Sequence, residues 1–134
     1  MHVDRHDALP IATDDDMVRV RQRVRDWAIT LGFSLVDQTK LVTAASELAR
    51  NTLIYGGGGT LTLEAVTNNG KRGLRLTFED HGPGIANIDL ALKDGYTTGN
   101  GLGLGLSGAR RLTQDFSVTS RPGEGTRVVI ARWN

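Results

Sequence analysis

The sequence predicts a two-layer α/β sandwich of the α+β class, with one mixed, mostly antiparallel sheet that carries helices on one face. Two observations predict this fold: helix-period runs gather in the first half of the chain, and strand-period runs come in pairs joined by short turns. Hairpins favour antiparallel neighbours, and amphipathic helices bury their apolar stripes economically against one face of such a sheet. At 134 residues the chain has the size of one domain, so we expect a single domain over residues 1–134.

The chain begins with an expected edge strand and a first helix. Residues 8–11 form a short apolar run, and its Pro10 is tolerated at a sheet edge. Acidic residues 14–16 stand where a helix N-terminus favours negative charge, and the helix that follows should end at Gly32. Its apolar residues recur at helical spacing, at Met17, Val20, Val24, Ala28 and Leu31.

A second long helix is predicted next. Ser34, with Asp37 three residues later, has the spacing of a capping box, and the four glycines at 56–59 should end the helix. Its expected inner face consists of Leu41, Ala45, Leu48 and Thr52.

The second half of the chain predicts two hairpins with a helix between them. Residues 60–67 and 73–80 alternate with period two around an Asn-Asn-Gly turn. Residues 102–116 have helical content despite their glycines, and residues 116–120 and 126–131 form another strand pair. The expected order is therefore β-α-α-β-β-loop-α-β-β.

Composition excludes several classes of function. The 16 basic and 15 acidic residues leave a formal charge of +1, which is too balanced for a broad nucleic-acid footprint, so we expect no nucleic-acid partner. The absence of cysteine excludes disulfides, zinc-thiolate sites and thiol catalysis. No apolar run reaches the length of a membrane span and no signal-peptide layout is present, so we expect a cytoplasmic protein without membrane contact.

Three segments carry candidate chemistry. Glu47 and Asn51 place a carboxylate and a carboxamide one turn apart on a helix face, which is also ordinary for solvated surface. Asp80 ends a strand before a turn in which Gly82 and Gly84 allow close backbone approach, and a plain turn with a capping aspartate remains an alternative.

Glycines dominate the third segment. Six of the 17 glycines fall between residues 95 and 108 and lead into a predicted helix, whose first N–H groups are free to bind an anion. Glycine is costly in helices, which suggests that a bulky charged ligand lies against this backbone; a merely flexible loop is the alternative.

In this order, the three segments resemble the N, G1 and G2 boxes of the GHKL (Bergerat-fold) ATPase and kinase superfamily. The matching strings are Glu47-Leu-Ala-Arg-Asn51, Asp80-His-Gly-Pro-Gly84 and Gly99 to Gly105. The resemblance implies ATP as the ligand and residues 88–100 as a lid over it. It also implies roles: Asp80 would accept the adenine amino group, Asn51 would coordinate Mg²⁺, and Glu47 would be the general base. The purine pocket would be shaped by Gly82 and Gly84 and supported by Thr126, and the phosphates would meet the backbone of Gly99, Gly101, Gly103 and Gly105.

Within this superfamily the chain is similar to the RsbT-type serine/threonine switch kinases of bacterial partner-switching stress pathways. The likeness rests on Val36-Asp-Gln38, Ser46 to Asn51, Glu79 to Ile85 and Asp94-Gly-Tyr96. It implies phosphorylation of a STAS-domain partner and activation of a PP2C-type phosphatase.

Two other functions stay open. An RsbW-like anti-sigma factor kinase would usually carry a His-Ala-Tyr-like continuation after the N-box asparagine, which residues 52–59 lack. A catalytically silent, ATP-dependent binding switch would have no need of Glu47.

Overall fold

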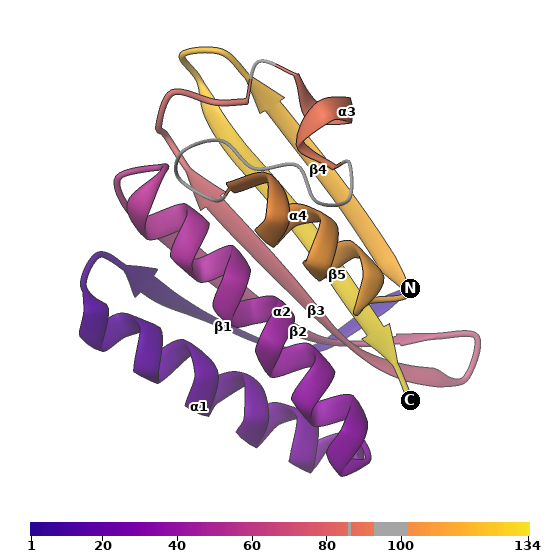
Figure 1. Ribbon diagram of the computed structural model, residues 1–134. Helices are drawn as coiled ribbons and strands as arrows, with labels where there is room; N and C mark the ends of the chain where they lie inside the picture. Colours follow the sequence, from indigo (N-terminus) through magenta and orange to yellow (C-terminus); the bar gives the residue numbers. More distant parts are fainter. Residues whose placement is uncertain (86, 93–101) are drawn as a thin grey trace.

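A computed structural model describes residues 1–85, 87–92 and 102–134 of the protein, and in the last range the side chains from residue 106 onward. Its centre is a five-stranded sheet with the order β1-β2-β3-β5-β4 (Figure 1). The strands are β1 His2–Ile11, β2 Gly59–Asn68, β3 Lys71–Asp80, β4 Asp115–Arg121 and β5 Gly125–Trp133. The helices are α1 Asp14–Thr30, α2 Leu35–Ile54, α3 Ile88–Ala91 and α4 Leu102–Arg111.

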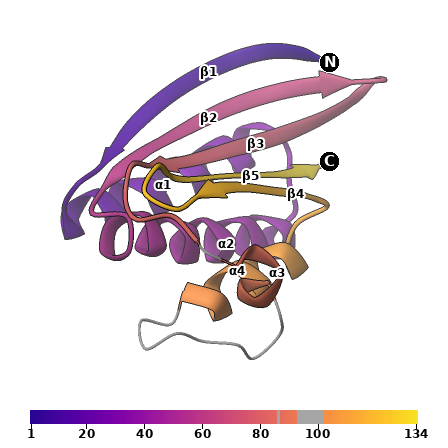
Figure 2. The ribbon, with the colours of Figure 1, turned by 90° about the horizontal axis from the view of Figure 1, so that it is seen from above.

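The helices lie on one face of the sheet, and no described helix covers the opposite face (Figure 2). Every described strand pairing is antiparallel. The predicted two-layer sandwich is therefore confirmed, with a sheet that is antiparallel rather than mixed over the described strands. None of the described helices is long and apolar enough to cross a lipid bilayer.

Capping side chains explain where α1 and α2 begin. Thr13 caps α1 in a reciprocal capping box with Asp16, whose carboxylate accepts hydrogen bonds from the N–H groups of Ala12 and Thr13 at 2.8 and 3.0 Å. The bond from Ala12 lowers the pKa of Asp16. The predicted box of α2 forms only by half: Ser34 accepts from the Asp37 N–H at 3.2 Å, but the Asp37 carboxylate binds elsewhere.

Arg132 of β5 is the partner that takes the Asp37 carboxylate. Its Nη2 donates to Asp37 Oδ1 at 2.7 Å, and its Nη1 donates to the carbonyl of Leu112 at 3.0 Å. The hydrogen bond from Arg132 lowers the pKa of Asp37. One arginine thus ties the start of α2 and the end of α4 to the sheet.

The same contact shortens the last predicted helix. α4 ends at Arg111 and not at residue 116, because Leu112 is held by Arg132 and the N–H of Gln114 already donates to the carbonyl of Ala131 in the sheet. The segment expected to be a lid contains the short helix α3, which Asn87 caps through a hydrogen bond from the Leu90 N–H. Much of the remaining lid lies outside the described residues. The N-terminal strand is also longer than expected, because β1 pairs with β2 from His2 onward.

The core lies between the helices and the sheet. The predicted inner face of α2, at Leu41, Ala45, Leu48 and Thr52, is buried, as are Val20, Val24 and Ala28 of α1. The turn between β2 and β3 has positive φ at Asn69 and Gly70, as the Asn-Asn-Gly string predicts for a tight hairpin. This packing places the C-terminal end of α2 beside the end of β3, where the candidate site lies.

Candidate functional site

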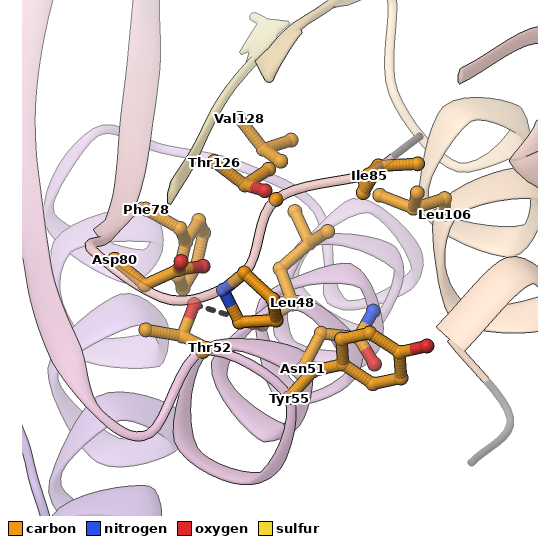
Figure 3. Close-up of a pocket in the computed structure, with 13 residues that line it drawn as sticks. Leu48, Asn51, Thr52, Tyr55, Phe78, Asp80, Ile85, Leu106, Thr126 and Val128 are labelled. Atoms are coloured by element: carbon orange, nitrogen blue, oxygen red, sulfur yellow. Dashed lines mark hydrogen bonds between the residues drawn. The ribbon is translucent and has the colours of Figure 1, made fainter. Parts of the chain in front are cut away.

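A pocket with an empty volume of about 380 Å³ lies between the helix layer and one end of the sheet (Figure 3). Side chains from α2, β3, the segment 83–85, α4 and β5 converge on it. The lining residues are Leu48, Asn51, Thr52, Tyr55, Gly56, Phe78, Asp80, Pro83, Gly84, Ile85, Leu106, Thr126 and Val128.

Asp80 is the charged side chain among the described residues that line the pocket. It ends β3, is partly buried, and its Oδ1 accepts a hydrogen bond from the Gly82 N–H at 2.9 Å. This bond fixes the side chain and leaves the second carboxylate oxygen for another donor. The backbone packs so closely around Asp80 that two neighbouring positions require glycine. A Cβ on Gly56 would lie 2.3 Å from Asp80 Cγ, and a Cβ on Gly82 would lie 2.7 Å from Gly56 Cα.

Two hydrogen bonds connect the turn after Asp80 to the β4–β5 hairpin. The carbonyl of Pro83 accepts from the Gly123 N–H at 2.7 Å, and the Ile85 N–H donates to Ser120 Oγ at 2.7 Å. Gly84 has a φ of +77°, and a Cβ there would lie 2.2 Å from the carbonyl oxygen of Arg121. Only glycine fits this crossing without displacing the hairpin.

Ser120 also orients Thr126. The two hydroxyl oxygens are 2.8 Å apart, and Ser120 Oγ donates to the carbonyl of Gly125 at 3.0 Å. Ser120 and Thr126 are directly opposite in the β4–β5 register. Because its donated proton goes to Gly125, Ser120 accepts from Thr126, which leaves an oxygen lone pair of Thr126 for a ligand.

Asn51 and Glu47 occupy successive turns of α2 but differ in their surroundings. Asn51 is partly buried and lines the pocket, and its Nδ2 is inaccessible without a hydrogen-bond partner in the described part of the chain. A buried amide nitrogen without a partner is uncommon, so this one suggests that a ligand or an ordered water completes the site. Glu47 is exposed and is not a lining residue of the pocket.

The glycine segment meets the pocket through α4. Gly103 and Gly105 lie in the first turns of α4, and Leu106, which follows them, lines the pocket. The first N–H groups of a helix have no partner within the helix and suit a phosphate. Gly99 and Gly101 lie outside the described residues.

The predicted residues therefore divide into three groups. Asn51, Asp80, Gly84 and Thr126 line one pocket, and Gly82 packs beneath it against Gly56. Glu47 lies on the exposed surface of α2 and does not line the pocket, and Gly103 and Gly105 precede the lining residue Leu106 in α4. The acceptor at Asp80, the unpartnered Asn51 amide and the glycine contacts fit a purine nucleotide. Among these groups, the side-chain oxygen of Asn51 is of the kind that Mg²⁺ prefers, and Mg²⁺ is usually held by one or two protein oxygens together with substrate phosphates.

Sequence reasoning missed several contributors to this site. Tyr55 lines the pocket one turn after Asn51, and the i to i+4 spacing is a signal that could have found it (Figure 3). The sequence indicates for Gly56 only the end of a helix, although its lack of a side chain leaves room for Asp80. Ser120 had no signal in its own segment, because its role depends on pairing with Thr126.

The chain is similar to proteins of known family. A family model described as histidine kinase-, DNA gyrase B-, and HSP90-like ATPase matches residues 36–133. Serine/threonine-protein kinase RsbT of Bacillus subtilis (strain 168) is 46% identical over 123 residues, which cover 92% of this chain and 92% of the relative. An anti-sigma F factor of Clostridium kluyveri is 32% identical over 118 residues, which cover 84% of this chain and 82% of the relative.

A solved structure shares the fold. The crystal structure of the RsbU and RsbW domains of Rv1364c from Mycobacterium tuberculosis matches with a TM-score of 0.65 and 21% identity, over 96% of this chain and 31% of that one. The family match runs from the start of α2 to the end of β5 and includes every lining residue of the pocket. The chain therefore belongs to the histidine kinase-, DNA gyrase B-, and HSP90-like ATPase family and, within it, to the RsbT-like serine/threonine-protein kinases.

Proposed function

We propose that this kinase transfers the γ-phosphoryl group of ATP, bound with Mg²⁺, to a serine or threonine of a STAS-domain protein in the cytoplasm. We propose further that, once released from this substrate, it activates a PP2C-type phosphatase. The observation that carries the proposal is the meeting of Asp80, Thr126 and the unpartnered Asn51 amide in one pocket, with an exposed carboxylate at Glu47 on the next turn. The name of the 46% identical relative supports the same activity.

Asp80 and its neighbours would hold the base of the nucleotide. The free carboxylate oxygen of Asp80 accepts a hydrogen bond from the exocyclic amino group of adenine, and the Thr126 hydroxyl, oriented by Ser120, lies at the same end. Gly82 and Gly84 keep the backbone close enough for this contact. The apolar side chains of the pocket cover the faces of the purine.

The phosphates would lie between α2 and α4. Asn51 would hold Mg²⁺ through its side-chain oxygen, and the backbone of Gly99, Gly101, Gly103 and Gly105 would donate to phosphate oxygens. Bound Mg²⁺ supplies positive charge that offsets the charge developing on the transferred group. The glycine backbone at the start of α4 keeps side chains out of the space that the phosphates need.

Glu47 would act as the general base. The acceptor hydroxyl oxygen forms a bond to the γ-phosphorus, the bond from that phosphorus to the β,γ-bridging oxygen breaks, and ADP leaves. The hydroxyl proton passes to the Glu47 carboxylate. An exposed position suits this role, because the acceptor belongs to another protein and has to reach the carboxylate from outside.

We propose further that residues 1–134 form one kinase domain. A single hydrophobic cluster joins residues of β1 and α1 to the rest of the helices and to β5, from Leu9 to Ile130. This continuity supports joint folding of the N-terminal elements, which precede the family match, with the nucleotide-binding elements.

Radiolabel transfer tests the function directly. The purified chain is incubated with γ-labelled ATP, Mg²⁺ and each purified STAS-domain protein of the source organism, and stable label on serine or threonine of one of them is expected. Addition of the chain to the organism's PP2C-type phosphatases should then raise the activity of one of them. If no STAS-domain protein is labelled by a chain that binds ATP, the substrate assignment is wrong.

A second candidate function is that of an anti-sigma factor kinase. The 32% identity to an anti-sigma F factor favours it. The two functions separate in a binding assay, because an anti-sigma factor would form a stable complex with a purified sigma factor and an RsbT-type kinase would not.

A further inference from the structure

We propose that the protein substrate docks on the exposed face of α2 around Glu47, with Arg50 and Ile54 as its main contacts. The partner chemistry that fits is a folded protein surface on which the acceptor serine or threonine is flanked by an acidic and an apolar side chain. This inference rests on the proposed function, because it takes Glu47 as the group that receives the hydroxyl proton.

The exposed face of α2 is a continuous stripe. Its members follow one another at intervals of mostly three or four residues, so they lie along one side of the helix, opposite the buried face. No other described element covers this stripe. It consists of Leu35, Val36, Thr39, Thr43, Glu47, Arg50 and Ile54.

A protein acceptor with an interface of typical size around Glu47 also covers the C-terminal half of this stripe. Ile54 is seven residues beyond Glu47, which corresponds to about 10 Å along a helix. A typical specific interface buries about 800 Å² on each partner, which is a patch of about 16 Å radius. A partner that places a hydroxyl group on Glu47 therefore also covers Arg50 and Ile54.

The chemistry of these two residues determines what the partner presents. Ile54 is 60% exposed, and it directly precedes Tyr55, which lines the nucleotide pocket. An apolar side chain of the partner would remove Ile54 from water beside the mouth of the pocket. Arg50 is exposed and makes no ion pair with another described residue, so its guanidinium is available to a carboxylate of the partner. Arginine is also among the residues enriched at the energetic centres of interfaces.

Steady-state kinetics of phosphoryl transfer test the inference, with the STAS-domain protein labelled in the transfer assay as the acceptor. We expect Ile54→Ser and Arg50→Glu each to raise the KM for that protein by about 5- to 30-fold, the usual effect of losing a main interface contact. The KM for ATP should not change, because neither residue lines the nucleotide pocket. Raising the salt concentration should raise the acceptor KM of the wild-type kinase more than that of Arg50→Glu.

Matched controls separate docking from general surface effects. Ile29→Ser removes a similarly exposed isoleucine, 55% accessible, from the far end of the helix pair, and Arg72→Glu reverses an exposed arginine on β3. Both should leave the acceptor KM within about twofold, as is usual for surface substitutions. Circular dichroism and the thermal shift by MgATP check that every variant is folded.

The outcomes distinguish this inference from the function on which it rests. If a STAS-domain protein is labelled and both α2 variants keep the wild-type acceptor KM, the docking face is wrong while the kinase function stands. The docking face would also be wrong if Ile29→Ser and Arg72→Glu raised the acceptor KM as much as the two α2 variants do. If no STAS-domain protein is labelled, the proposed function fails and the docking inference fails with it.

Discussion

Replacing Asp80 by asparagine should weaken ATP binding while the protein stays folded. In the wild type, one carboxylate oxygen accepts from the Gly82 N–H at 2.9 Å, and the other is available to a ligand. Asparagine can keep the first contact with its amide oxygen. Its NH₂ group then takes the place of the second oxygen and faces the adenine amino group, so that two donors meet and the ligand hydrogen bond is lost.

The size of this loss follows from the charge of the acceptor. A hydrogen bond to a charged group contributes about 1.5–3 kcal/mol, and each 1.4 kcal/mol changes affinity about tenfold, so the Kd for MgATP should rise by about ten- to over a hundredfold. The partly buried position of Asp80 favours the upper part of this range, because water competes less for the contact.

Isothermal titration calorimetry with MgATP measures the effect, and thermal unfolding without nucleotide checks the fold. Glu79→Gln is the matched control: it removes one negative charge from the adjacent residue, which is exposed, lies 3.8 Å from Arg127 and does not line the pocket. Its Kd should equal that of the wild type. A folded Asp80→Asn variant with wild-type affinity would refute the assignment of the adenine end of the pocket.

Four further outcomes are expected. Glu47→Ala should bind MgATP like the wild type but transfer phosphoryl groups about 10²–10⁴-fold more slowly, the usual contribution of a general base, and undiminished radiolabel transfer would assign the proton to another group. Asn51→Ala should lose the part of ATP affinity that depends on Mg²⁺, measured by titration with and without chelator; an unchanged Mg²⁺ dependence would contradict its role. Gly103→Ala should leave the Tm without nucleotide unchanged or raise it, since alanine is favoured over glycine in a helix by up to about 1 kcal/mol. The same variant should reduce the Tm shift caused by MgATP, and a full shift would show that the phosphates do not lie against Gly103. Because Arg132 lowers the pKa of Asp37, this carboxylate stabilises the fold at neutral pH and ceases to do so as the pH falls below about 4. The Tm of Asp37→Asn should therefore lie furthest below that of the wild type near pH 7, and the two Tm values should become equal in acid. A difference in Tm that persists at low pH would contradict this linkage.

The fold was predictable wherever the signal is local and repeated. The stripes of α1 and α2 follow a helical period over several turns, and each hairpin carries its own turn residues, so their faces and pairings could be read directly. The four-residue helix α3 is too short for any period to appear. The end of α4 and the half-formed cap of α2 both depend on Arg132, which lies 95 residues from Asp37 and leaves no local trace.

The same distinction applies to the site. Asp80, Gly82 and Gly84 stand in one short string whose chemistry is visible in order, and Asn51 follows Glu47 by one helical turn. Contributions that arise across the fold escaped prediction. Ser120 acts by orienting Thr126, which lies opposite it in the β4–β5 hairpin. Gly56 is required because the carboxylate of Asp80, which is distant in the sequence, occupies the space that a side chain at position 56 would fill.

The place of β5 in the sheet has a consequence for how the enzyme is made. β5 follows β4 in the sequence, yet it lies between β3 and β4 in the sheet, and it brings Thr126 and Val128 to the pocket. On the ribosome, α2, β2 and β3 emerge earlier and can pair, but the binding site stays open on one side until the β4–β5 hairpin has docked. If ATP binds in this pocket as proposed, it recognises only chains in which this late step is complete, and it then stabilises the fully folded kinase over its partly folded precursors.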